Sequence, residues 1–183
     1  MEATNKVRGI AHDFDVAKIT IRGVPDRPGI AGRLLTVLAE ANINVDMIIQ
    51  NEPQSGGGLA DMSFTVPRDD LPAARKSLEG AREELGFGAM QTDEHMGKVS
   101  IVGAGMKSHP GVAARTFSVL GEAGVNIEMI STSPIKISCV VREQDVETAV
   151  RELHTAFELG SDAVVAEDVT GVHRPVVREE TAS

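Results

Sequence analysis

The sequence predicts an α+β protein built from two copies of one β-α-β-β-α-β module, with the first copy inserted into the second. The main observation is an internal repeat, because residues 18–51 are similar to residues 98–133 when their two Pro-Gly steps are aligned. A repeat of this length indicates two equivalent structural units. The second observation is the order of strand-like and helix-like segments in each copy, which is typical of a ferredoxin-like sheet with two helices on one face. Identical aligned pairs include Pro28/Pro110, Gly29/Gly111, Arg33/Arg115, Glu40/Glu122, Asn44/Asn126, Met47/Met129 and Ile48/Ile130.

In the first module, Ile19 and Ile21 alternate with polar residues, which predicts a strand over residues 18–23. The turn VPDRPG follows, and its second proline, Pro28, suits the first position of a helix because proline lacks an N–H group. Apolar residues at helical spacing predict that this helix reaches Ala41. The remaining predicted elements are strands over 43–50 and 60–66, a helix opened by Asp69, Asp70 and Pro72 and stopped by Gly86, and a weak strand over 87–96.

The second module repeats this order but lacks a clear final strand. Its predicted elements are strands over 99–102, 126–131 and 135–141 and helices over 112–123 and 145–157. Residues 163–166 are a weak candidate for the missing strand, and the isolated β-type run at 7–11 is a better one. Using the latter inserts the first module into the second. We therefore expect one domain at 15–97, a second at 1–14 plus 98–168, and a poorly ordered tail at 169–183.

Composition limits the possible functions. The 183 residues are 42% hydrophobic, which allows one ordinary core or two small ones, and the repeat favours two. A net charge of −9 with no Trp or Tyr argues against binding to nucleic acid. The sequence shows no basic-then-apolar leader and no membrane-spanning apolar run, so we expect a cytoplasmic protein that does not bind membranes. The single cysteine, Cys139, lies in an alternating apolar run and is expected to be a buried strand residue.

No catalytic constellation is found in the sequence, and we predict no catalytic residue, metal or cofactor. The five histidines have no metal-ligand spacing. The glycine-rich loop before Pro110 resembles a dinucleotide loop, but Ser108 occupies the sixth position of that fingerprint and the strand order is wrong for a parallel sheet. A small hydrolase such as an acylphosphatase would need an arginine in the turn, and Arg27 is replaced by His109 in the second copy.

The strand-to-helix turn is the remaining candidate site. Backbone N–H groups at the start of a helix bind small anions, and Gly29 or Gly111 lets a ligand approach them closely. Asp26 places a carboxylate beside these donors, so the turn offers both polarities that an α-amino acid requires. The alternative is that Asp26 only caps the helix. The spacing alone favours neither interpretation.

Four segments resemble a known family. They are GVPDRPGIAG, NINVDMIIQN, KVSIVGAGMKSHPGVAARTF and GVNIEMISTSPIKISCVV. Together they are similar to the tandem ACT domains in the regulatory region, or separate β subunit, of lysine- and threonine-sensitive aspartate kinases. The resemblance covers about residues 7–159 and does not include the kinase domain. A start at Met1 just before VRGIAHDFD is similar to a β subunit made from an internal start, although an excised fragment would look the same.

The resemblance implies the same inserted arrangement and a homodimer in which module one of each chain lies beside module two of the other. It also implies amino-acid effectors at these junctions. The threonine pocket would be formed by Asp26, Pro28, Gly29, Ile30 and Gln50 of one chain with Asn126 and Ile127 of the other. The second pocket would be formed by Met106, Ser108, His109, Gly111 and Val112, facing Asn44, Val45 and Asp46 of the partner.

The second pocket departs from the first because Ser108 stands where Asp26 stands in the first module. Lysine is the expected ligand there, with Asp46 as its counter-charge. The function that the resemblance implies is feedback inhibition: the chain would bind threonine and lysine and control phosphorylation of aspartate by an aspartate kinase catalytic subunit in amino-acid biosynthesis. The alternative is a free-standing ACT amino-acid sensor that acts on another enzyme or on a transcription factor.

Overall fold

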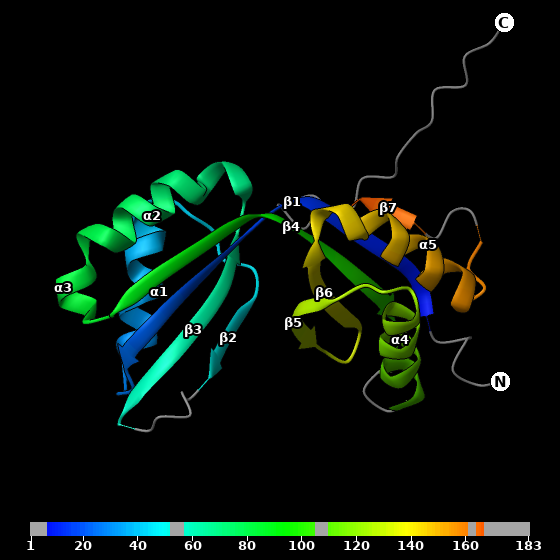
Figure 1. Ribbon diagram of the computed structural model, residues 1–183, viewed down its shortest axis with the longest axis horizontal. Helices are drawn as coiled ribbons and strands as arrows, with labels where there is room; N and C mark the ends of the chain where they lie inside the picture. The colour runs from blue at the N-terminus through cyan, green and yellow to red at the C-terminus, as the bar shows by residue number, and fades with distance from the viewer. Residues whose placement is uncertain (1–6, 52–56, 105–109, 161–163, 167–183) are drawn as a thin grey trace, which may run out of the picture. The chain divides into compact units, whose positions relative to one another are not determined.

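A computed structural model of the chain describes residues 7–51, 57–104, 110–160 and 164–166. The chain divides into two compact units (Figure 1). We call residues 15–96 the inserted unit, and residues 1–14 with 97–183 the split unit. The predicted α+β fold class, with one module inserted into the other, is confirmed. The predicted tail at 169–183 lies outside the described residues.

The inserted unit is an antiparallel sheet combined with helices. Its strands follow the order β2-β3-β1-β4, and Ile19 of β1 lies opposite Phe64 of β3. The strands are β1 (Val7–Pro25), β2 (Ile48–Asn51), β3 (Leu59–Val66) and β4 (Ala89–Gly103). The helices are α1 (Ile30–Glu40), α2 (Leu71–Gly80) and α3 (Arg82–Leu85), with a 3-10 turn, η2 (Arg68–Asp70), before α2.

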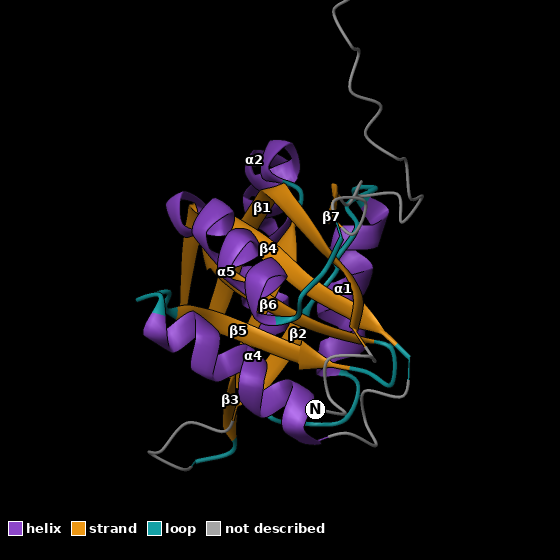
Figure 2. Cartoon of the chain, turned by 90° about the vertical axis from the view of Figure 1, so that its right-hand side faces the viewer, coloured by secondary structure: helices purple, strands orange, loops and turns teal. Residues whose placement is uncertain are grey.

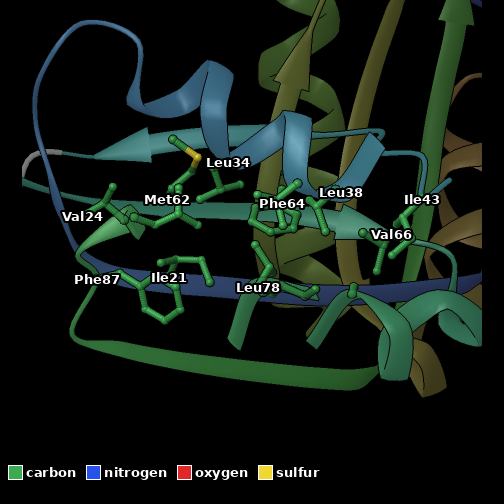
Figure 3. Close-up of a cluster of buried hydrophobic side chains, with 14 of the residues drawn as sticks. Ile21, Val24, Leu34, Leu38, Ile43, Met62, Phe64, Val66, Leu78 and Phe87 are labelled. Carbon is green, nitrogen blue, oxygen red and sulfur yellow. The ribbon is translucent and has the colours of Figure 1, made fainter. Parts of the chain in front are cut away.

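The core of the inserted unit lies between its sheet and its helices (Figure 3). Alternate residues of β1, Ile19 and Ile21, are fully buried, as expected for a strand with one covered face. Leu34 and Leu38 of α1 are buried one turn apart and belong to the same cluster as Phe64. This packing fixes the start of α1 against the end of β1, where the candidate site lies.

The split unit has the same design. Its strands follow the order β1-β4-β6-β5, and the short strand β7 pairs with β1. It uses the first part of β1 and the last part of β4, together with β5 (Ile127–Thr132), β6 (Lys136–Arg142) and β7 (Val164–Ala166). The helices α4 (Pro110–Glu122) and α5 (Val146–Ala156) pack together (Figure 2), and a 3-10 turn, η4 (Glu143–Asp145), precedes α5.

Five of the predicted strands differ from the structure in their bounds. The two strands expected at 7–11 and 18–23 form one continuous strand, β1, and those expected at 87–96 and 99–102 form the continuous strand β4. The strand expected over 43–50 begins only at Ile48. Before it, the pairing is irregular, because the Met47 amide donates to the Thr65 hydroxyl at 3.1 Å.

The split unit has its expected fourth strand and one further short strand. Residues 7–11, the preferred candidate for the fourth strand, lie in β1, which stands beside β4 in the order β1-β4-β6-β5. Val164 to Ala166 pair in parallel with Ile10 to His12 of β1. Residues 164–166 therefore add a strand to β1 and do not replace residues 7–11.

Candidate functional site

The candidate site is the turn that joins β1 to α1. Gly23 adopts a left-handed conformation with φ of 70°, and its amide donates to Oδ1 of Asp61 at 3.0 Å. The amide of Asp26 donates to the carbonyl of Gly58 at 2.7 Å. Both partners belong to the start of β3 or to the residues just before it. The turn is therefore held from the side by the neighbouring strand.

The helix begins two residues later than the proline position suggested. We expected Pro28 at the first helical position, but α1 starts at Ile30, and Gly29 is its N-cap with φ of 92° and ψ of −17°. Any residue with a Cβ would be strained in this conformation, so glycine is required here. The carbonyl of Gly29 still accepts the amide of Arg33 at 3.0 Å, which starts the helical hydrogen bonding.

The Asp26 carboxylate does not cap α1. Its Oδ1 accepts a hydrogen bond of 3.3 Å from Nε2 of Gln50, which comes from β2. Both side chains are exposed to solvent. The capping interpretation is therefore not supported, and the structure brings together two residues, 24 positions apart in sequence, that the resemblance assigns to one pocket.

The arrangement suits a small zwitterion chemically. Pro28 and Gly29 are exposed at the helix start, whereas the Ile30 side chain is buried at 6% exposure and anchors the turn in the core. Backbone N–H groups of the first turn attract a carboxylate. The Asp26 carboxylate attracts an ammonium group, and the Gln50 amide can donate to a carboxylate through its NH2 group or accept from an ammonium group through its oxygen. The turn can therefore hold a free α-amino acid by both of its charged groups.

The residues assigned to the facing half of the second pocket lie between α1 and β2. Asn42 ends α1 in a left-handed conformation with φ of 59°. Asn44 and Asp46 that follow are exposed, whereas Val45 packs against the core of the inserted unit. The Asp46 amide donates to the carbonyl of Thr65 at 3.1 Å, which fixes the position of this segment beside β3.

The split unit carries the remaining predicted residues. Gly111 is exposed and Val112 is fully buried in the first turn of α4. Asn126 is exposed and Ile127 half-buried where β5 begins. Met106, Ser108 and His109 lie outside the described residues. The predicted residues therefore fall on two units, and within the inserted unit a hydrogen bond joins Asp26 to Gln50.

Supporting residues of the turn were not identified from the sequence. Asp61 and Gly23 form the hydrogen bond described above, and they are 38 positions apart. The sequence signal for this hydrogen bond was a polar residue, Asp61, in the strand that pairs with β1, together with Gly23 at the end of the alternating part of β1. Strand periodicity alone does not give the register that pairs them.

Other possible chemistry is limited in the described part of the chain. Burial raises the pKa of the Cys139 thiol to about 12, so it stays protonated and unreactive near neutral pH. No group of three His, Cys, Asp or Glu residues within the described ranges could hold a metal ion. None of the described helices is both long and apolar enough to cross a membrane.

Comparison with known proteins identifies both units. Residues 19–83 and residues 99–157 each match a family model described as "ACT domain". The aspartokinase of Mycobacterium tuberculosis H37Rv is 48% identical over 154 residues, which are 84% of this chain and 37% of that protein. The aspartate kinase of Pseudomonas fluorescens is 50% identical over 157 residues, which are 86% of this chain and 38% of that protein. The chain thus spans a little over a third of the length of these curated relatives.

Solved structures extend the comparison over whole chains. A crystal structure titled aspartokinase alpha and beta subunits contains a chain that is 49% identical, with a TM-score of 0.77. The match covers 84% of this chain and 99% of that one. The ligand-free regulatory subunit of aspartate kinase from Thermus thermophilus is 42% identical with a TM-score of 0.77, and the match covers 83% of this chain and 99% of that subunit.

Proposed function

Because the chain belongs to the tandem ACT-domain regulatory regions of aspartate kinases, we propose that it senses threonine and lysine and controls phosphorylation of aspartate by a catalytic subunit. The family assignment rests on identities of 49% and 42% to chains that it covers almost completely. The effectors and the catalytic partner are the proposed part. The observation that supports a threonine pocket is the contact between Asp26 and Gln50 beside the uncapped start of α1.

The charges of threonine match the Asp26 turn. Its carboxylate would face the amides at the start of α1, and its ammonium group would face the Asp26 carboxylate. The Gln50 amide, 3.3 Å from Asp26, would orient that carboxylate. In this proposal Asn126 and Ile127 of a second copy close the pocket, because both lie at the exposed beginning of β5. The functional form would then be a homodimer.

Lysine is the proposed ligand of the second pocket. Gly111, in the first turn of α4, is the repeat equivalent of Gly29. Ser108 provides no negative charge in place of Asp26, so the charge has to come from the facing segment. The exposed Asp46 would meet the lysine side chain from the partner copy. This assignment predicts that the two pockets differ in ligand charge.

Titration calorimetry with threonine, lysine, methionine, homoserine and aspartate tests the proposal. We expect threonine to bind the parent chain, and Asp26→Asn to abolish most of that binding because the neutral amide no longer attracts the ammonium group. Asp69→Asn is the matched control, since Asp69 is an exposed carboxylate of the same unit in η2. Equal threonine binding by Asp26→Asn and the parent would overturn the assignment.

The same calorimetry tests the lysine assignment with a separate variant. Asp46→Asn should weaken lysine binding and leave threonine binding unchanged, because the two pockets use different carboxylates. Loss of threonine binding in Asp46→Asn would show that the proposed division of ligands is wrong. Mixing the chain with an aspartate kinase catalytic chain, and following activity with and without threonine, tests the partner.

A further inference from the structure

The split unit has an open groove between α4 and α5. It has a volume of about 550 Å³, and its lining includes Arg115, Ser118, Val119, Ala123, Thr155 and Ala156. The two helices contact each other directly (Figure 2), and side chains from both line the groove. No residue of the groove belongs to the proposed effector pockets. It is therefore a feature that effector binding does not explain.

The inserted unit shows what covers the same place in its own fold. Arg33 is the repeat equivalent of Arg115, and here the short helix α3 follows α2 and packs against α1. Glu84 of α3 accepts hydrogen bonds from Nε and Nη2 of Arg33, the second at 3.0 Å. A helical turn with a carboxylate therefore lies over this arginine.

No such turn is present in the described residues 157–160 that follow α5. The α5 helix ends at Ala156, and Glu158 has a left-handed conformation with φ of 54°. Nε and Nη2 of Arg115 both donate to the Ala156 carbonyl, at 3.1 and 2.7 Å. In the inserted unit the equivalent carbonyl, of Ala81, accepts the Leu85 amide of α3 at 2.9 Å. The Arg115 side chain thus takes the hydrogen bond that α3 would otherwise make.

From this comparison we infer that the α4–α5 groove is a docking site for a helical turn of a partner chain that presents a carboxylate to Arg115. One neutral carbonyl now accepts both donors of Arg115, and a carboxylate is the stronger, bidentate acceptor. The groove floor contributes small apolar side chains, Val119 and Ala123, on which such a turn can pack. This inference is independent of the proposed effectors.

Two carboxylates also line the groove, and neither prevents this docking. Glu122 is the repeat equivalent of Glu40, which lies 3.7 Å from Arg33 while Glu84 occupies the same arginine. Glu152 has its Oε1 atom 3.1 Å from Nε of Arg151, so its charge is partly compensated. The inserted unit therefore already accommodates an incoming carboxylate next to a resident one.

The test uses the α3 segment as a probe. Residues 79–88, EGAREELGFG, would be fused behind Ser183 of the full chain through a flexible Gly/Ser linker of about 20 residues, which raises the effective concentration to about millimolar. We expect nuclear magnetic resonance shifts at the amides of Ser118 and Ala123 and at Nε–H of Arg115. Glu84→Gln in the fused copy should lower the equilibrium constant for docking by up to about fivefold, because one exposed ion pair contributes up to about 1 kcal/mol.

Two further arms separate docking from folding effects. Ser118→Arg fills the groove from an exposed position and should abolish the shifts without changing the melting midpoint or threonine binding. Absence of groove shifts in the fusion would overturn the proposal, and so would equal shifts with Glu84→Gln in the fused segment. Concentration-dependent groove shifts in the chain without the fusion would assign the groove to a second copy and refute the partner assignment.

Discussion

Left-handed backbone conformations follow four of the described helices, at Asn42, Gly86, Gly124 and Glu158. Asn42 after α1 and Gly124 after α4 are repeat equivalents, with φ of 59° and 72°. In both, the next residue returns its amide to a carbonyl five positions earlier, as Ile43 does to Leu38 at 3.0 Å. Glu158 has the same role after α5 with φ of 54°. A side chain with a Cβ is strained there, since the left-handed region costs about 1–2 kcal/mol for most residues.

Glu158→Gly should therefore stabilise the split unit by about 1 kcal/mol, with part of the relieved strain offset by the greater freedom of glycine in the unfolded chain. Urea unfolding followed by circular dichroism measures this change. Glu147→Gly is the control of opposite sign, because Glu147 is exposed in the first turn of α5 and glycine within a helix costs about 1 kcal/mol. A lower midpoint for Glu158→Gly would show that its conformation is not strained.

The Cys139 thiol gives a second prediction at the scale of single residues. It is fully buried in β6, and the removal of water raises its pKa to about 12. The native thiol should react with iodoacetamide at pH 8 only when the split unit opens, so the labelling rate should rise steeply in urea. Rapid labelling of the native protein at the rate of a free thiol would contradict its burial.

At the scale of elements, β4 depends on one close backbone approach. A Cβ atom added to Gly97 would lie 2.3 Å from Cγ2 of Val146 and 3.2 Å from the carbonyl of Asp13. Gly97→Ala should therefore destabilise the split unit by about 1–3 kcal/mol, the usual cost of overpacking. Val146→Ala in the same chain should recover part of this loss, because it removes the clashing methyl groups.

Gly121→Ala provides the comparison for this pair. Gly121 lies in α4, and a Cβ there would meet nothing within 4 Å. This substitution should raise the free energy of unfolding by about 0.5–1 kcal/mol, because alanine is the better helix residue. Equal effects of the two glycine substitutions in a urea titration would show that the contact between Gly97 and Val146 is not restrictive.

The sequence predicted which helices and strands exist better than it predicted how long they are. The helix from the Pro-Gly turn to Ala41 was predicted because Leu34 and Leu38 recur on one face. The continuity of β1 through His12 and Asp15 could not be predicted, because its polar residues interrupt the alternation and only pairing with other strands keeps the chain extended. For the same reason residues 163–166 were only a weak strand candidate in the sequence. The three residues of β7 form a strand through their parallel pairing with β1.

For the candidate site, too, the sequence predicted some features and not others. Asp26 and Gly29 could be selected from the sequence because a turn of that composition leads into a helix. The hydrogen bond from Gln50 to Asp26 depends on the register of β2 with β3, in which Gln50 lies opposite Met62. Register follows from side-chain packing across strands and is not visible in local periodicity. The resemblance to a family supplied this pairing, and the structure supplied its geometry.

At the scale of the whole molecule, the residues assigned to the proposed threonine pocket belong to two different units of one chain. The Asp26 turn belongs to the inserted unit, and Asn126 belongs to the split unit. If two copies exchange these halves, a ligand that binds only the folded dimer stabilises it by about 2.7 kcal/mol at one hundred times its Kd. For a chain of this size each kcal/mol moves the melting midpoint by about 2–4 °C, so saturating threonine should raise it by about 5–10 °C.

Mixed dimers test this exchange directly. Gln50→Ala and Asn126→Ala should each remove most of the threonine-induced rise, because each variant lacks one half of both pockets in its own dimer. After unfolding and refolding together, the mixture contains dimers in which one pocket has both residues intact, and the rise should partly return. A shared ligand also couples binding to assembly, so threonine should lower the dimer dissociation constant seen in ultracentrifugation by the same free energy. If refolded mixtures respond to threonine no better than either variant alone, the pocket lies within a single chain, and the effector cannot act by holding two chains together.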